Sequence, residues 1–556
     1  MSETDFSAPL DMLLTQASLG MRRFIPDRSA FTMLGAAARQ PGLVASRVGG
    51  LASELRRVAV GTSAIAPSPR DQRFADPAWM NNPILKRIVQ AYLAAGNTAD
   101  GLVNELTLDW SDSERLRFVV SNLIAALSPS NNPLISPVAW KALIDTGGGN
   151  VVTGVRQAVG DLSSSPHIPS MVDRDAFELG ETVAVSDGAV VMRTQMFELI
   201  QYKPTTEQVY EVPLLIIPPT INKFYVLDMA PGRSLIEYLL GQGHQVFVVS
   251  WRNPDARHAH WGFDEYADAI FQAFNAVDAI TGVGTAHTVA ACSGGLLGVI
   301  TAAHRVAAGG GNRLASVSLL VTMIDQQRAG TVGAIASRKL AEQAVARSRR
   351  KGYLDGRQLA EVFAWLRPGD LIWNYWVNNY LQGKKPPAFD ILYWNADTTR
   401  MAAKLHADFV DVALENKLAR PGALTVLGTE IDLRKIHADS YVVAGSADHI
   451  CPWENCYRSS QLLGGKVRFV LSTNGHIAAL VNPPGNPKSS YRVSDDNTLD
   501  AEDWAREAPT VQGSWWPDYS QWLADRSQGM RPAPTELGDP QHRPMESAPG
   551  TYVRDA

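Results

Sequence analysis

The stretch His287–Ile300, HTVAACSGGLLGVI, carries the strongest fold signal in this 556-residue chain. It runs from an apolar, β-branched segment through Ala-Cys-Ser-Gly-Gly into a segment with helical character. A nucleophile elbow has this layout, usually G-x-S-x-G, because a sharp strand-to-helix turn needs small neighbours to hold its central side chain clear of a sheet. The stretch therefore predicts a strand, a turn with an exposed side chain, and a helix.

Two neighbouring residues fit the centre of that turn. Cys292 gives the pattern Ala-Ala-Cys-Ser-Gly, and Ser293 gives Ala-Cys-Ser-Gly-Gly. In both registers an alanine stands at the first glycine position, so spacing alone leaves the choice open. The following helix would favour a thiolate at Cys292 through the positive end of its dipole. A buried cysteine with only a packing role is the alternative interpretation.

Short apolar runs on both sides of the elbow alternate with helical patterns. Such alternation predicts an α/β domain with a largely parallel sheet. A hairpin before these runs is expected from Glu181–Val185 and Ala189–Met192 on either side of Ser-Asp-Gly. The expected buried strands are Pro213–Ile217, Val246–Ser250, Thr288–Ala291, Val317–Ile324, Ser440–Ala444 and Val467–Leu471.

Loops after the last two of these strands hold an acid and a base. One reads Gly-Ser-Ala-Asp-His and ends at His449, and the other reads Ser-Thr-Asn-Gly-His and ends at His476. The order nucleophile, acid, histidine is that of the α/β-hydrolase fold. We predict that His476 is the general base and that Asp448 orients it. Asp325 is the alternative acid, and His449 is either a pocket residue or a packed histidine.

An oxyanion hole would need the N–H after the nucleophile and a second one from an early loop. With Cys292 as nucleophile the first belongs to Ser293. The loop Pro218–Lys223 follows an early strand, and its candidate amides are those of Ile221 and Asn222. A purely structural turn, fixed by the two prolines, is the alternative for this loop.

The chain divides into three parts by pattern. Residues 1–178 read as a helical N-terminal domain, residues 179–524 as an α/β-hydrolase domain, and residues 525–556 as a proline-rich, extended tail. The gap of about 325–438 between two strands is too long for a loop and predicts an insertion.

Four of the 14 tryptophans lie in that insertion: Trp365, Trp373, Trp376 and Trp394. We expect a cap or apolar pocket wall, with Trp394 as a substrate-pocket candidate, or else a cap that merely has its own core.

Composition excludes several classes of protein. The 51 Lys and Arg against 56 Asp and Glu argue against a nucleic-acid-binding protein. The three cysteines give neither a disulfide framework nor the C-x-x-C spacing of a zinc site, so no metal site is expected. No signal peptide and no transmembrane helix are expected, which makes the cytoplasm the expected compartment.

A cysteine nucleophile would suit one reaction class in particular. A thiol that accepts an acyl group from a thioester forms another thioester at little cost in free energy, so the acyl group stays activated for transfer to a hydroxyl. Cysteine therefore favours acyl transfer from a coenzyme A thioester over ester hydrolysis, although cysteine hydrolases with this fold exist.

These residues resemble the polyhydroxyalkanoate synthases, from about Arg73 to the C-terminus. The length and the ending APGTYV at Val553 are most similar to class II, which implies medium-chain monomers and no second type of subunit. The matching segments are Arg73–Trp79 (RFADPAW), Leu214–Lys223 (LLIIPPTINK), Val249–Pro254 (VSWRNP), Ala291–Gly295 (ACSGG), Asp370–Tyr380 (DLIWNYWVNNY), Phe389–Asp397 (FDILYWNAD), Asp448–Trp453 (DHICPW) and Asn474–Ile477 (NGHI).

Position by position, the resemblance implies a nucleophile at Cys292, an acid at Asp448 and a base at His476. It thereby favours Cys292 over Ser293. The chain departs from the family at Ala290, where the family usually has glycine, and at Cys451, where it often has threonine. We expect the Ala290 methyl to tighten the elbow and attribute Cys451 to local packing.

The implied activity is polymerisation of (R)-3-hydroxyacyl-CoA into polyester with release of coenzyme A, through an acyl-cysteine and without a separate cofactor. A homodimer at the surface of cytoplasmic polymer granules is also implied, with granule-associated proteins as possible partners and residues 1–70 as a candidate granule contact. The alternatives are a cysteine-dependent polyester or thioester hydrolase of the same fold, and a non-catalytic granule-surface protein.

Overall fold

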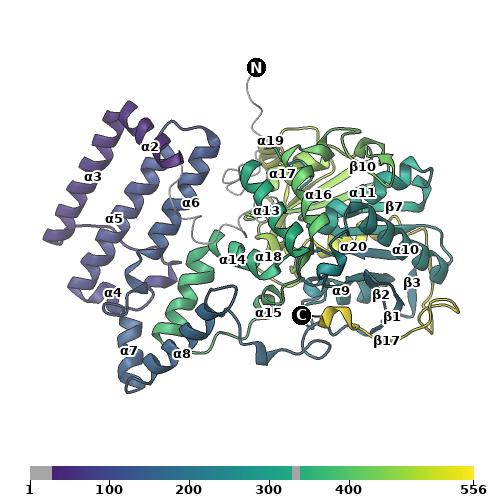
Figure 1. The fold of residues 1–556 in the computed structure, drawn as a ribbon, viewed down its shortest axis with the longest axis horizontal. Helices are drawn as coiled ribbons and strands as arrows, with labels where there is room; N and C mark the ends of the chain where they lie inside the picture. The colour runs from purple at the N-terminus through teal and green to yellow at the C-terminus, as the bar shows by residue number, and fades with distance from the viewer. Residues whose placement is uncertain (1–27, 328–337, 556) are drawn as a thin grey trace. The chain divides into compact units, whose positions relative to one another are not determined.

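The computed structural model describes residues 28–327 and 338–555 and contains two compact units (Figure 1). Of the described residues, the sheet unit contains 174–327, 338–356 and 389–555, and the helical unit contains 28–173 and 357–388. Each unit is described by itself below.

An 11-stranded sheet organises the sheet unit. Its six central strands are parallel, and antiparallel strands flank them at both edges. These six are the buried strands expected from the sequence, so the α/β-hydrolase fold class is confirmed. In spatial order the strands are β15 (Thr510–Gln512), β14 (Ser490–Ser494), β13 (Val467–Ser472), β12 (Ser440–Gly445), β7 (Leu314–Leu320), β6 (Ala286–Ala291), β4 (Leu214–Ile217), β5 (Val246–Trp251), β2 (Phe197–Tyr202), β1 (Gly188–Arg193) and β17 (Glu546–Ser547).

Helices and short ribbons surround this sheet (Figure 1). The helices are α9 (Leu235–Gly241), α10 (Phe263–Thr281), α11 (Ser293–Ala307), α13 (Arg338–Lys351), α15 (Asp390–Ala396), α16 (Ala403–Leu414), α17 (Trp453–Ser460), α18 (His476–Leu480), α19 (Ala501–Glu507) and α20 (Trp516–Ala524). The ribbons pair β3 (Gln208–Tyr210) with β16 (Met530–Pro532), β8 (Tyr353–Leu354) with β9 (Met401–Ala402), and β10 (Thr425–Val426) with β11 (Thr429–Glu430).

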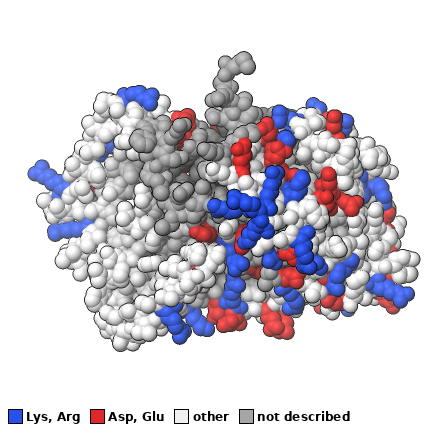
Figure 2. Space-filling view, in the orientation of Figure 1, with Lys and Arg blue, Asp and Glu red and all other residues white. Residues whose placement is uncertain are grey.

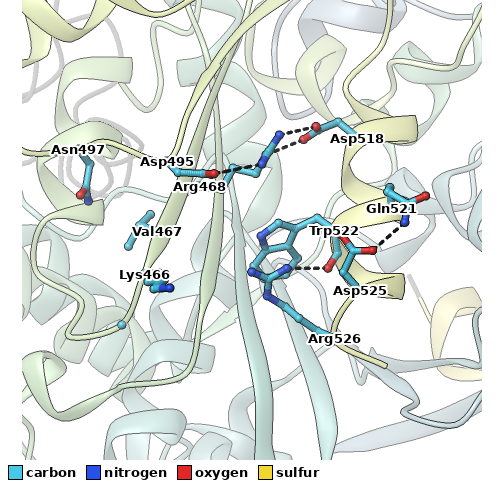
Figure 3. Close-up of a pocket in the computed structure, with 11 residues that line it drawn as sticks. Lys466, Val467, Arg468, Asp495, Asn497, Asp518, Gln521, Trp522, Asp525 and Arg526 are labelled. Atoms are coloured by element: carbon cyan, nitrogen blue, oxygen red, sulfur yellow. Dashed lines mark hydrogen bonds and ion pairs between the residues drawn. The ribbon is translucent and has the colours of Figure 1, made fainter. Parts of the chain in front are cut away.

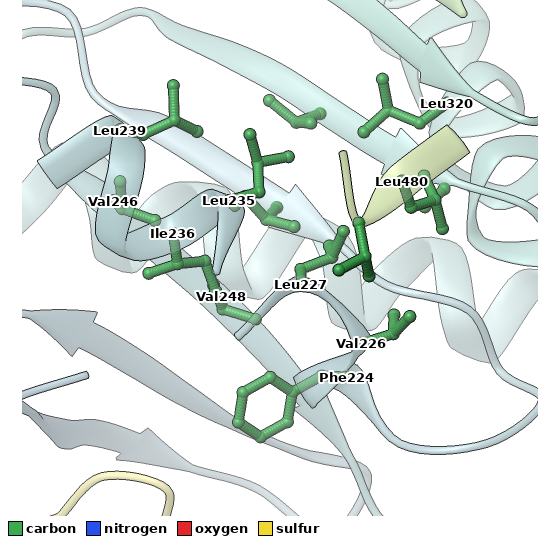
Figure 4. Close-up of a cluster of buried hydrophobic side chains, with 14 of the residues drawn as sticks. Phe224, Val226, Leu227, Leu235, Ile236, Leu239, Val246, Val248, Leu320 and Leu480 are labelled. Carbon is green, nitrogen blue, oxygen red and sulfur yellow. The ribbon is translucent and has the colours of Figure 1, made fainter. Parts of the chain in front are cut away.

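Both faces of the sheet are buried, which explains why its strands read as continuous apolar runs. On β5, Val246 and Val248 are two residues apart and face the same cluster as Leu235 and Leu239 of α9 (Figure 4). Helices α18 and α20 contribute to the same cluster. Helix α11 packs against β4, β6 and β7. Each large aliphatic side chain buried in this way contributes about 1.5–3 kcal/mol.

The expected hairpin around Ser186–Gly188 is wrong. Residues 181–185 form a turn, in which Ala184 has a φ of 56°, rather than a strand. The antiparallel partner of β1 is β2, which follows it after a turn where Thr194 Oγ1 accepts the N–H groups of Met196 and Phe197. Strand β2 is buried along its whole length, so it lacks the alternation that marks a hairpin strand.

Strand β7 also differs from its expected range of Val317–Ile324. It begins at Leu314 and ends at Leu320, because Val321 adopts a φ of 45° and turns the chain out of the sheet. Since the turn falls beside the elbow, it brings Leu320 next to Cys292.

The C-terminal segment follows the sheet unit in short extended pieces. Strand β16 pairs with β3, and β17 pairs with β1 at the sheet edge. Beyond them, the buried Lys223 Nζ donates to the carbonyl oxygens of Val553 (2.9 Å) and Asp555 (2.5 Å). The segment after Asp525 is therefore fixed to the loop that follows β4.

The helical unit contains the N-terminal helices together with part of the expected insertion. Its helices are α2 (Arg28–Arg39), α3 (Pro41–Val60), α4 (Ala78–Asn81), α5 (Pro83–Glu105), α6 (Trp110–Ala126), α7 (Pro137–Asp145), α8 (Gly149–Ser163) and most of α14 (Gly356–Leu366), followed by two π-helical turns, Gly369–Trp373 and Trp376–Leu381.

Residues 357–388 therefore belong with the N-terminal helices, whereas the sequence-based division placed them in a cap of the catalytic domain. Gly154 of α8 allows this packing, since a Cβ there would lie 2.0 Å from the carbonyl oxygen of Tyr380. Asn150 Nδ2 donates to the Leu381 oxygen at 2.8 Å. Trp365, Trp373 and Trp376 form an edge-to-face series within this unit.

Many large apolar side chains of the helical unit are exposed. On the face shown in Figure 2, much of this unit carries neither acidic nor basic side chains, whereas both signs intermingle over the sheet unit. None of the described helices is long and apolar enough to span a membrane. The exposed set includes Ile84, Leu123, Leu127, Leu134, Trp140, Ile144, Val151, Val152, Val155, Val159 and Leu162.

Candidate active site

Cys292 stands at a strained turn between β6 and α11. Its φ of 50° and ψ of −121° lie in a region that L residues rarely adopt, at a cost of about 1–3 kcal/mol. The Cys292 N–H donates to the Leu320 oxygen of β7 at 2.9 Å, which helps to hold the turn. The side chain is half-buried, so this is the geometry of a nucleophile elbow.

The residues after Cys292 must be small because other backbone lies close to them. A Cβ on Gly294 would lie 2.2 Å from the Pro218 oxygen, and one on Gly295 would lie 2.0 Å from Thr322 Oγ1. A turn later, a Cβ on Gly298 would lie 2.7 Å from the Cβ of Ala290. The Ala290 methyl thus packs against Gly298 of α11.

Asp448 and His476 come from the loops after β12 and β13. His476 Nδ1 and Asp448 Oδ2 are 2.6 Å apart, and both side chains are buried. The other carboxylate oxygen, Asp448 Oδ1, accepts the N–H groups of Ile450 (2.8 Å) and Cys451 (2.9 Å). The carboxylate is therefore fixed on both sides, and its bond to Nδ1 leaves Nε2 of His476 for the nucleophile.

The elbow and the histidine loop meet at one place. One ligand atom each of Cys292, Cys451 and His476 lies within 4.8 Å of the other two. The structure thus brings together the three residues expected from sequence, Cys292, His476 and Asp448, in the order of a nucleophile–base–acid triad.

Neighbouring groups favour the charged forms of Cys292 and His476. A hydrogen bond with Cys451 lowers the pKa of Cys292 well below its usual range; burial opposes the shift, and the charge of His476 adds to it. Burial on its own lowers the pKa of His476, but the charges of Asp448 and Cys292 outweigh burial and raise it to about 10. The pair therefore favours a thiolate beside an imidazolium at neutral pH.

Cys451 is a site residue that sequence reasoning missed. It is buried beside Cys292, and the hydrogen bond to Cys292, followed by burial, raises its pKa well above the usual range. The available signal was its position three residues after Asp448 in the same loop. Its sulfur lies within 4.8 Å of the Cys292 sulfur, so it adjoins the nucleophile.

The loop after β4 faces the elbow. The Thr220 N–H donates to Ser293 Oγ at 2.9 Å, and the Asn222 N–H donates to Thr399 Oγ1 at 2.8 Å. The Ile221 N–H has no hydrogen-bond partner among the described residues. Of the two amides suggested for this loop, only that of Ile221 is therefore available to a substrate oxygen.

The other candidates lie outside this triad. Asp325 accepts a hydrogen bond from Asn416 Nδ2 (2.9 Å) and forms an ion pair with Arg458 (3.2 Å). Its carboxylate is therefore bound to these two residues, whereas His476 is paired with Asp448. His449 is half-buried beside Asp448. Trp394 is buried, and its indole N–H donates to the Lys223 oxygen at 2.7 Å, which fixes it in the core beside the β4 loop.

A cavity of about 600 Å³ lies at the other end of the sheet (Figure 3). Its lining includes Val467, the first residue of β13, whereas His476 lies beyond the last residue of that strand, at the start of α18. Six residues of strand span roughly 20 Å. Arg468 of this cavity forms an ion pair with Asp518, and Arg526 stacks on Trp522. This cavity is therefore separate from the triad.

Two family models match the chain. The model described as "Poly-beta-hydroxybutyrate polymerase (PhaC) N-terminus" matches residues 70–239, and the model described as "alpha/beta hydrolase fold" matches residues 213–483. The second match contains the elbow and both loops of the triad.

Curated relatives match nearly the whole chain. Poly(3-hydroxyalkanoate) polymerase 1 of Ectopseudomonas oleovorans is 44% identical over 97% of this chain and 96% of its own length. Poly(3-hydroxyalkanoate) polymerase 2 of the same organism is 45% identical over 93% and 92%, respectively. Poly(3-hydroxyalkanoate) polymerase subunit PhaC of Cupriavidus necator is 38% identical over 87% and 83%. At this identity and coverage, the chain belongs to the poly(3-hydroxyalkanoate) polymerase family of acyltransferase enzymes.

Proposed function

We propose that this protein polymerises (R)-3-hydroxyacyl-CoA into polyester and holds the acyl group on Cys292 during the reaction. The observation that carries the proposal is the strained Cys292 elbow, with His476 and its Asp448 partner beside it. The polymerase names of the relatives supply the substrate class.

In the first half-reaction, Cys292 Sγ attacks the carbonyl carbon of the thioester. The carbon–sulfur bond to coenzyme A breaks, and the departing sulfur takes the proton held by His476. In the second half-reaction, His476 accepts the proton of an attacking hydroxyl, the hydroxyl oxygen forms the ester bond, and Cys292 leaves as thiolate. Asp448 holds the imidazole in the orientation that both proton transfers require.

Two backbone amides would stabilise the oxyanion. The Ser293 N–H follows the nucleophile at the first residue of α11, and the Ile221 N–H, which has no hydrogen-bond partner among the described residues, lies in the β4 loop next to Thr220. Both are fixed before substrate binds, since the Thr220 N–H ties the loop to Ser293 Oγ.

A thiol nucleophile suits this substrate energetically. Transfer from coenzyme A to Cys292 exchanges one thioester for another, so the energy of the thioester remains available for ester formation. The proposal needs no cofactor, because coenzyme A arrives as part of the substrate.

We place the enzyme at the surface of cytoplasmic polymer granules, as a homodimer, with the helical unit as the granule contact. Support comes from the exposed apolar side chains of α7 and α8, among them Trp140, Val152 and Val155. Granule contact by residues 1–70 is also proposed; residues 1–27 of that segment lie outside the described residues.

The test supplies purified full-length protein with (R)-3-hydroxyacyl-CoA and follows free coenzyme A thiol and insoluble polyester. Release of both supports the proposal. Thiol release without polymer would indicate a hydrolase, and no release would indicate a non-catalytic protein. Cys456→Ala is a matched control for Cys292→Ala, because Cys456 is a buried thiol near the site that lies outside the triad.

A further inference from the structure

Two thiols and one imidazole converge at the triad, although the catalytic cycle uses only one of the thiols. Cys292 comes from the elbow, Cys451 from the loop after β12, and His476 from the start of α18. Their ligand atoms lie within 4.8 Å of one another. We propose that these three residues bind Zn²⁺ and that the bound ion reversibly blocks the enzyme.

The spacing fits a tetrahedral zinc ion after a small closure. Bond lengths of about 2.3 Å to sulfur and about 2.0 Å to nitrogen place tetrahedral ligand atoms about 3.5–3.8 Å apart. Side chains whose ligand atoms start within 4.8 Å need to approach by about 1.3 Å at most. Sequence reasoning expected no metal site because it considered only cysteines close together in the chain, whereas Cys292 and Cys451 come from different loops.

The groups around these ligands have the arrangement that zinc sites require. A zinc-bound histidine normally donates its other ring nitrogen to a carboxylate, which fixes the tautomer that presents the free nitrogen to the metal. His476 Nδ1 makes this bond to Asp448 Oδ2 at 2.6 Å, and Asp448 Oδ1 accepts the Cys451 N–H at 2.9 Å. One carboxylate therefore positions two of the three ligands.

Three protein ligands leave the fourth zinc position open to water, as in catalytic zinc sites. Cys451 and His476 are buried, while Cys292 is half-buried, so an ion would reach the site past Cys292. The two sulfurs bind as thiolates and His476 binds as a neutral imidazole, so the proton of the Cys451 thiol and the proton of the Cys292–His476 pair are released to solvent and no electrons are transferred. An ion on the Cys292 sulfur occupies the atom that accepts the acyl group, so zinc and acyl-CoA exclude each other. The block rests on the proposed function of Cys292; the binding of zinc does not.

The binding experiment uses the full-length protein without substrate. Co²⁺ is titrated as a spectroscopic probe, and Zn²⁺ affinity is measured by competition with a chromophoric chelator. We expect one ion per chain with a thiolate-to-cobalt charge-transfer band. Cys451→Ser should weaken Zn²⁺ binding at least about 10-fold, since a hydroxyl is a poor zinc ligand.

Cys456→Ser is the matched control, because it removes a buried thiol of the same segment and leaves all three ligands. It should bind Zn²⁺ like the wild type. Equal Zn²⁺ affinity of the wild type and Cys451→Ser, or a cobalt complex without a charge-transfer band, would overturn the site. Thermal melting of each metal-free variant shows whether a loss of binding reflects a loss of folding.

The second arm measures inhibition, with each variant compared with its own metal-free rate. Wild-type activity should fall with Zn²⁺ and return when a chelator is added, while Cys451→Ser should need at least about 10-fold more Zn²⁺. Equal sensitivity of both would refute the proposed block. If the protein binds zinc but forms no polymer, the proposed function is refuted and the metal site stands. If it forms polymer but binds no zinc, the metal site is refuted and the proposed function stands.

Discussion

The sheet unit and the helical unit differ in how far their apolar side chains are buried. In the sheet unit the six parallel strands are almost completely buried, and the charged triad residues are held by specific partners. In the helical unit, α7 and α8 expose Ile144, Val152 and Val159 to solvent at 64–75% of their surface. One unit uses its apolar residues for its own core, and the other presents many of them outward.

This difference indicates that internal packing limits which substitutions the sheet unit tolerates, whereas an interaction surface limits them in the helical unit. A buried sheet beside a strained elbow tolerates few changes, because each side chain has neighbours on every side. An exposed apolar surface of this extent contributes little to the stability of its own unit and is typical of an interaction surface. Substitutions in the sheet unit should therefore reduce stability or activity, whereas substitutions on the exposed surface of the helical unit should reduce binding to a partner surface.

The largest effect should come from Cys292→Ala in the sheet unit. Loss of the nucleophile should reduce polymer formation at least about 1,000-fold, while the fold is retained. Release of coenzyme A thiol and the mass of insoluble polyester measure the effect. Polymerisation by Cys292→Ala at a rate close to that of Cys456→Ala would exclude the acyl-cysteine mechanism.

Asp448→Asn should come next, with a loss of about 100- to 10,000-fold in kcat. Its removal takes away a charge that raises the pKa of His476, so the imidazolium is lost at lower pH and the pKa of Cys292 rises. In the wild type, alkylation of Cys292 should stay fast until the pH falls below its lowered pKa. In Asp448→Asn the alkylation profile should move to higher pH, whereas Asp325→Asn should leave its position unchanged.

A pair of glycine substitutions compares the two units directly. Gly294→Ala would place a methyl group 2.2 Å from the Pro218 oxygen and should destabilise the protein by at least about 2 kcal/mol. Gly160→Ala in α8 has no atom within 4 Å of the new Cβ and should stabilise its helix by about 0.5–1 kcal/mol. Denaturant unfolding measures both. Equal destabilisation by Gly294→Ala and Gly160→Ala would show that the two positions are equally tightly packed.

The smallest effects on stability should come from the helical surface. Val152→Ser and Val155→Ser, alone or together, should change the free energy of unfolding by less than about 0.5 kcal/mol each. The double variant should nonetheless bind polyester beads less tightly in a sedimentation assay. Val511→Ser, exposed on the sheet unit, is the control that should bind beads like the wild type. Unchanged binding by the double variant would exclude α8 as the contact.

The sequence predicted the centre of the sheet unit well because buried parallel strands and an elbow both leave local patterns. Each of the six apolar runs became a parallel strand, and the loops ending at Asp448 and His476 meet at the elbow. Strand β2 was missed because burial on both faces, including that of Glu198, removes the alternation that reveals an edge hairpin.

Other features depend on contacts that no local pattern records. The assignment of residues 357–388 to the helical unit depends on Gly154, whose missing side chain lets Tyr380 approach. The contact of Cys451 with Cys292 depends on where two distant loops meet. For the same reason, the sequence could not choose between the amides of Ile221 and Asn222, since the choice depends on Thr399.

The bonds from Lys223 to Val553 and Asp555 have a consequence for biosynthesis. They support the loop that carries the Ile221 amide, and they join it to residues more than 300 positions later in the chain. A nascent chain on the ribosome can form the elbow and both triad loops while this support is still missing. The loop therefore gains this support only after residues 553–555 have left the exit tunnel.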